Sequence, residues 1–284
     1  MDAETIYQGA GPQDCETQPA YASATFHADQ VAHCRADSHH RISLLIGSII
    51  ELHRQRVDLH KAEKSLTLQI KAKCRRLCDG DKKEAGTLYA SMFNGKGHEM
   101  AETCLMAAAP FIQARSLLNE QRAACEKELT KAAKELPVWP WVESVRGFGA
   151  GSLAAIIGES GDLSQYANPA KLWKRMGLAV INGGRQRKVS GADAIEHGYA
   201  PHRRSIVWNL GDTMLKGTVR KVKDEDGEDT GGRTALNEYG QMYLERKAYE
   251  RPRVESDAHA HNRAKRYMEK RLLRDLWTAW RAAE

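Results

Sequence analysis

Apolar residues recur at helical intervals along much of the first half of the chain. Between residues 36 and 78 there is no proline and a single glycine, and four leucines fall at seven-residue intervals from Leu45 onward. This repeat is typical of a long helix that packs along one seam against another helix. Arg56 and Glu63 occupy core positions of the same register, which favours a short antiparallel hairpin over a long dimeric zipper.

Turn signals divide the rest of this half. Asp-Gly-Asp at 79–81 and Asn-Gly-Lys-Gly at 94–97 predict breaks between helices. A further helical run extends from about 99 to 136, with Pro110 as an expected kink or boundary. We therefore expect a helical, coiled-coil-like arm at 28–136.

The composition changes at Pro137, beyond which cysteines disappear and glycines and tryptophans become frequent. A second domain is therefore predicted at 137–284. Within it, residues 163–223 contain 12 Lys and Arg against three acidic residues, a balance of 12 − 3 = +9. The acidic run 224–229 predicts a solvated loop, and apolar residues on one face predict a last helix over about 259–283.

Charge and hydrophobicity over the whole chain indicate a folded protein. Its 284 residues carry 43 Lys and Arg against 37 Asp and Glu, a net charge of +6, and 42% of them are hydrophobic. No apolar run approaches the ~20 residues of a membrane-spanning helix, and the start lacks the pattern of a secretion signal. We expect a cytoplasmic protein with no membrane partner. Residues 1–27 show no lasting periodicity, which predicts a flexible tail.

The six cysteines all lie in the first 125 residues, and in a cytoplasmic chain we expect them to be reduced thiols. Cys74 and Cys78 are four residues apart on one helical face, with histidines upstream. No Cys-x-x-Cys pair and no second pair at zinc-finger spacing exists, so no metal site is predicted. Neither a phosphate-cradling P-loop nor a dinucleotide fingerprint occurs, and no cofactor is expected.

The strongest local motif lies at 145–159, where Gly147 and Gly149 bracket Phe148 before a short run of small and apolar residues. This pattern is typical of a helix-hairpin-helix, in which the glycines permit a tight turn and the phenylalanine fills the space between the two helices. The backbone N–H groups of the turn and the start of the second helix, at Gly151 and Ser152, would then face a DNA phosphate. The alternative is an ordinary glycine turn before a core helix.

Several ordered blocks extend from this motif through about half the chain. They are 145–159, 161–166, 170–172, 176–179, 197–199, 203–208, 239–247, 261–266 and 270–277. Together they resemble the C-terminal domain of the insertion-sequence transposases of the IS one-ten group. The resemblance implies a DNA-binding protein that acts in, or derives from, DNA transposition and recombination of a mobile element.

That family also has an N-terminal RNase-H-like domain with four acidic metal ligands. Nothing before residue 36 supplies the apolar strands that such a domain needs. The metal-dependent catalytic half is therefore expected to be missing, which implies a separate nuclease-domain partner if the protein still acts in recombination.

The family further implies a nucleophilic serine in the loop after a Gly-Leu-Ala-Pro element. Here Val180 replaces the proline, and Ser190 in the Ser-Gly pair of the same loop is the candidate nucleophile. A serine hydroxyl needs an activating base or metal, and the neighbouring cations cannot serve as that base at neutral pH. A turn or helix-cap serine is the alternative.

The sequence thus predicts a mostly α protein with a helical hairpin or coiled-coil arm and a C-terminal domain that contains a helix-hairpin-helix. The expected partners are DNA, or structured or guide RNA, and a second copy of the chain held through the arm. The residues expected to contact phosphates are Gly147, Phe148, Gly149, Gly151, Ser152, Lys171, Lys174, Arg175, Arg185, Arg187, Lys188, Arg203, Arg204, Arg263 and Arg266. The alternatives are a recombinase that uses Ser190 and a helical interaction module without nucleic-acid function.

Overall fold

The computed structural model describes the backbone of residues 21–95 and 97–283 and the side chains of residues 39–95 and 97–283. The chain divides into two compact units, one that ends at Ile42 and one that covers 43–284. Helix α1 (Tyr21–Leu77) supplies the described backbone of the first unit. The last residues of the predicted tail are therefore helical, and the predicted tail before Tyr21 lies outside the described residues.

Helices dominate the described chain, which confirms the predicted mostly α fold. After α1 the elements are α2 (Lys82–Asn94), α3 (Ala101–Lys134), α4 (Trp139–Ser144), α5 (Ala150–Ser160), η1 (Leu163–Gln165), α6 (Pro169–Arg175), β1 (Val180–Ile181), β2 (Gly184–Arg185), α7 (Asp193–His197), α8 (Pro201–Thr218), β3 (Val219–Lys223), β4 (Asp229–Ala235), α9 (Glu238–Glu250), η2 (Arg251–Arg253) and α10 (Asp257–Ala283). No helix among the described residues is both long and apolar enough to cross a bilayer.

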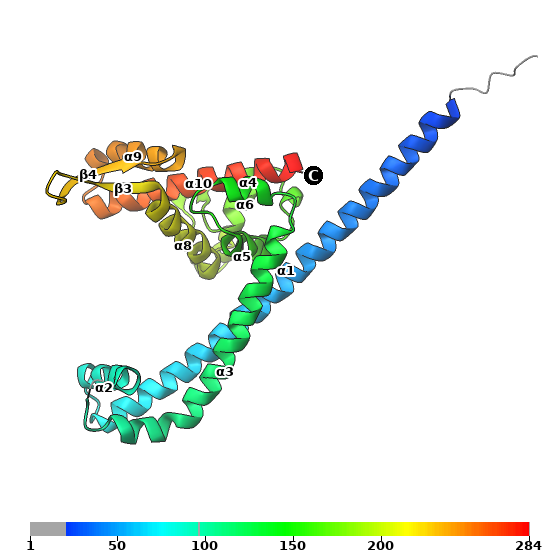
Figure 1. Ribbon diagram of the computed structural model, residues 1–284. Coiled ribbons are helices and arrows are strands. Elements are labelled where there is room, and N and C mark those ends of the chain that lie inside the picture. Colours follow the sequence, from blue (N-terminus) through cyan, green and yellow to red (C-terminus); the bar gives the residue numbers. More distant parts are fainter. Residues whose placement is uncertain (1–20, 96, 284) are drawn as a thin grey trace, which may run out of the picture. The chain divides into compact units, whose positions relative to one another are not determined.

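The arm is an antiparallel hairpin of α3 against the second half of α1, with α2 at its closed end (Figure 1). The break between α1 and α2 falls where the sequence predicts it. The Asp81 carboxylate accepts hydrogen bonds from two backbone N–H groups in the first turn of α2, and Gly95 ends that helix at φ 63°. Pro110 lies inside α3 and is not a boundary.

The seam of the arm is most deeply buried at two isoleucines of the predicted register, and the four predicted leucines are partly buried. Ile49 and Ile70 are fully buried, whereas the leucine at position 45 is only half-buried. The two charged residues at core positions are matched by opposite charges on α3. Arg56 Nε lies 3.0 Å from Glu126 Oε1, and Arg122 Nε lies 2.9 Å from Glu63 Oε2. These pairs explain how a seam with charged residues can still close.

The arm continues into the C-terminal half without a unit boundary. Residues 43–284 form one compact unit, so the predicted division at 136/137 lies within a unit. The end of α3 packs on α5, and His53 of α1 contacts Glu159 of α5 at 3.2 Å. A Cβ at Gly158 would lie 2.4 Å from the His53 ring, so this glycine allows the close approach.

Helix α10 is the central element of the C-terminal half. Its predicted apolar face is buried, with Met268, Leu272, Leu276 and Trp280 each no more than 3% exposed. It packs against α6, α8 and α9. This arrangement places one side of α10 opposite the start of α8 and the loop after β2.

The acidic run 224–229 is solvated, as predicted, but it forms the end of a β-hairpin. Strands β3 and β4 pair antiparallel from Val219 with Ala235 to Lys223 with Asp229, with an irregularity between Lys221 and Lys223. The sequence predicts only a loop here, because the strand residues are basic and glycine-rich rather than alternating apolar and polar.

Candidate nucleic-acid interface

The predicted glycine turn joins α4 to α5 and packs partly against α8. Gly147 has φ +89°, and a Cβ there would lie 2.8 Å from Met214 Cα of α8. Phe148 is 4% exposed, and its ring makes an edge contact with that of Trp141 of α4 at a centroid distance of 6.2 Å. A glycine is therefore needed at position 147 for two reasons: the backbone has a positive φ, and α8 leaves no room for a Cβ.

The start of α5 is open, but it faces the arm. Gly149 and Gly151 are exposed, and Gly151 and Ser152 line a pocket of about 370 Å³ together with Arg56 and Glu126 of the arm. Because Glu126 is an acid, this pocket is less suited to a phosphate than the sequence suggests. The assignment of the turn as a phosphate-binding helix-hairpin-helix stays a prediction.

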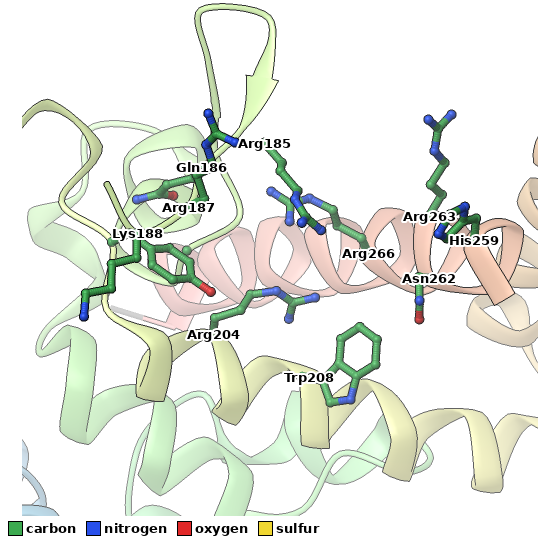
Figure 2. A pocket seen from close by; sticks show the side chains of 12 residues that line it. Arg185, Gln186, Arg187, Lys188, Arg204, Trp208, His259, Asn262, Arg263 and Arg266 are labelled. Carbon is green, nitrogen blue, oxygen red and sulfur yellow. The ribbon is translucent and has the colours of Figure 1, made fainter. Parts of the chain in front are cut away.

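A larger pocket of about 910 Å³ lies between α8, α10 and the segment after β2 (Figure 2). Six of the predicted phosphate contacts line it, from three separate stretches of sequence. Its lining consists of Gly177, Arg185, Gln186, Arg187, Lys188, Tyr199, Arg204, Trp208, His259, Asn262, Arg263 and Arg266. None of these described lining residues is acidic. We call this site the basic pocket.

The segment 185–188 is held by a buried glutamine between exposed cations. Gln186 is 3% exposed, and its side-chain amide donates to the backbone oxygens of Lys174 and His197 while its carbonyl oxygen accepts from the Ala179 N–H. Arg185 and Arg187 on either side are exposed. One anchored residue thus places both guanidinium groups at the rim of the basic pocket.

Arg204 on α8 forms the floor of the basic pocket with a buried carboxylate behind it. Its Nη2 lies 2.9 Å from Glu269 Oε2 of α10, and the two side chains are 13% and 1% exposed. The other terminal nitrogen, Nη1, is buried and has no hydrogen-bond partner in the described part of the chain. An unpaired buried guanidinium N–H is costly, and an anion in the pocket would satisfy it.

The surroundings of the Glu269 carboxylate also shift its pKa. Burial raises the pKa of Glu269 to about 7, against the opposing effect of Arg204 and Lys265. Lys265 lies between the basic residues Arg263 and Arg266 in the sequence, yet it is fully buried and contacts Asp212. It also lies 3.5 Å from the Trp208 ring, so it belongs to the floor of the site and not to its surface.

The two arginines of α10 approach the pocket from the opposite side. Arg266 donates to the Ala179 backbone oxygen at 3.1 Å, and burial followed by the charge of Arg204 lowers its pKa. Arg263 is exposed and pairs with Glu250 at 3.1 Å. Figure 2 shows Arg204 reaching from α8 toward the α10 side of the pocket.

The remaining predicted cations lie elsewhere. Lys171, Lys174, Arg175 and Arg203 line a smaller pocket of about 380 Å³. Two of them are already engaged with Glu159: Arg203 Nε lies 2.9 Å from its carboxylate, and Arg175 Nε donates to its backbone oxygen at 2.8 Å. These contacts leave fewer free donors here than in the basic pocket.

Ser190 is exposed in the loop before α7 and does not line the basic pocket. Within the described residues its hydroxyl makes no hydrogen bond to a histidine or carboxylate. The activating base that nucleophilic chemistry requires is therefore not assembled around this serine in the described structure.

Sequence reasoning did not identify Tyr199, Trp208 or Asn262 as part of the site. Each lies on a different segment, and only the packing of α8 against α10 brings them to the cations. Trp208 is partly buried, and Lys265 Nζ lies 3.5 Å from the centroid of its ring. No local signal distinguishes a tryptophan beside a pocket from one in the core.

No family model, curated protein or solved structure gives a significant match to this chain. The resemblance to the transposase family therefore rests on the sequence blocks alone.

Proposed function

We propose that the C-terminal half of this protein binds nucleic acid through the sugar-phosphate backbone. The observation that carries the proposal is the basic pocket, where six Lys and Arg side chains from three segments converge without an acidic lining residue. Phosphate contacts of this kind position a strand and carry little sequence information.

The charges of the pocket favour a polyanion over a small neutral ligand. Arg185, Arg187 and Lys188 are exposed and have no acidic partner among the described residues. Arg204 adds a buried N–H that has no hydrogen-bond partner within the part of the chain that the structure describes. Guanidinium groups suit phosphate because their planar donors match its oxygens.

The test is fluorescence anisotropy with duplex, branched and RNA probes over a series of salt concentrations. We expect log K to fall linearly with log salt. Binding that is absent or insensitive to salt would reject the proposal and favour the helical interaction module. The ranking of the three probes would identify the preferred nucleic acid.

We propose further that this binding serves DNA transposition or recombination, with the cutting chemistry supplied by a separate nuclease-domain partner. The support is the ordered set of sequence blocks that resembles the transposases. The competing hypothesis, a recombinase that uses Ser190, requires a covalent protein–DNA adduct. We expect no adduct on denaturing gels; an adduct that forms with the natural chain and disappears in Ser190→Ala would establish the recombinase instead.

A further inference from the structure

A cysteine, a glutamate and a histidine meet at the closed end of the arm, far along the chain from the basic pocket. Cys78 follows α1, Glu84 lies in the first turn of α2, and His98 lies in the link before α3. Their ligand atoms all lie within 4.8 Å of one another. We propose that these three side chains form a binding site for a zinc ion.

The spacing fits a four-coordinate ion. Two ligands that each lie ~2.1 Å from a tetrahedral zinc are about 3.4 Å apart. His98 Nε2 lies 3.8 Å from Glu84 Oε1, so small side-chain rotations bring the set to bonding distance. Binding through Nε2 moves the ring proton to Nδ1, and the ring gives up the hydrogen bond that Nδ1 accepts from the Met100 N–H at 3.2 Å.

The backbone around the site is held in place by capping contacts. The Asp81 carboxylate accepts from the Lys83 and Glu84 N–H groups at 2.7 and 2.9 Å, which fixes the turn that carries one ligand. Cys78 is 6% exposed and belongs to a buried cluster with Cys74 and Cys104. The protein therefore closes one side of the site firmly.

The other side is open to solvent. The Glu84 side chain is 55% exposed, whereas that of His98 is 12% exposed. Three protein ligands with an open fourth position are typical of zinc sites that keep a water ligand. A thiolate with an imidazole and a carboxylate selects zinc over magnesium or calcium, which prefer oxygen ligands alone. The ion would connect the end of α1, the first turn of α2 and the link before α3.

The test is titration of the full, reduced chain with Co²⁺ after removal of metals with a chelator. We expect one equivalent to bind, with a sulfur-to-cobalt charge-transfer band, and Zn²⁺ to displace it. Cys78→Ser should remove the band, and Glu84→Gln and His98→Gln should weaken binding ten-fold or more. Circular dichroism would check that each variant folds, which the exposure of Glu84 favours.

The arm offers matched controls. His60 and Glu63 form a second His–Glu pair at 3.8 Å, and no cysteine among the described side chains shares a cluster with it. His60→Gln should therefore leave cobalt binding unchanged, as should Cys125→Ser, whose thiol instead donates to the Leu52 backbone oxygen. Failure to bind one equivalent, or a band that survives Cys78→Ser, would overturn the proposal without affecting the nucleic-acid site.

Discussion

Removal of the three exposed cations at the rim of the basic pocket should weaken nucleic-acid binding in a defined way. Arg185, Arg187 and Lys188 are exposed and lack acidic partners in the described structure, whereas Arg204 and Arg263 each pair with a glutamate. The triple alanine variant should therefore lose contacts to as many as three phosphates and leave the buried floor intact.

The expected magnitude follows from counterion release. Each phosphate contact to duplex DNA contributes ~0.9 to the slope of log K against log salt, so the slope should fall by about 2.7. If the lines of log K against log salt for the natural chain and the variant meet at ~1 M salt, the change in slope lowers the affinity roughly 100-fold at about 0.15 M salt. That loss equals about 3 kcal/mol.

The assay is fluorescence anisotropy from about 0.05 to 0.3 M salt, with circular dichroism to check the fold. A control with the same charge loss is available on α1, where Lys64, Arg75 and Arg76 are exposed. Their triple alanine variant should change the slope by less than half as much. Equal effects of the two variants would refute a localised site and indicate a response to net charge alone.

Three further predictions concern the stability of the fold. Gly147→Ala should destabilise the protein by about 2 kcal/mol or more in urea unfolding, because φ is +89° and the new Cβ would lie 2.8 Å from the α8 backbone; Gly149→Ala, with open space around it, should cost less than 1 kcal/mol. Arg122→Glu should cost about 1 kcal/mol by breaking its pair with Glu63 across the arm and its pair with Glu126 within α3, and Glu63→Arg in the same chain should recover part of that loss in a double-mutant cycle. Burial raises the pKa of Glu269 to about 7, above its value in the unfolded chain, so the folded state binds the proton more tightly. The free energy of unfolding should therefore fall as pH rises from about 4.5 through 7. Glu269→Gln should flatten this profile, and an unchanged profile would assign the pH dependence to other groups.

Local patterns were sufficient to predict the three longest helices, α1, α3 and α10. Asp81 caps the first turn of α2, and the apolar face of α10 repeats at helical spacing. Both signals lie within short windows of sequence. The mostly α fold follows from such signals. The β3–β4 hairpin was missed because its strands are stabilised by backbone pairing and cross-strand charges, such as Lys221 with Asp229 at 2.8 Å, rather than by a buried face.

The candidate site was only partly predictable. An arginine can bind a phosphate only where its guanidinium group is not already paired with an acid. Such pairs join distant positions, as Arg203 does with Glu159, and sequence spacing alone does not show them. Lys265 has basic neighbours in Arg263 and Arg266, but it is fully buried on the inward face of α10. The sequence identifies the charge-rich segment. Which of its cations line the basic pocket depends on the packing of α8 against α10.

The charge pairs of the arm also restrict how its two helices can slide. Arg122 and Glu126 are one turn apart on α3, and they face Glu63 and Arg56 on α1. A slip of α3 by one turn would bring Arg122 opposite Arg56 and set two positive charges against each other. The charge pairs therefore favour the observed alignment, and we expect an insertion of four residues on one side to bulge outward at the tip instead of shifting the pairing.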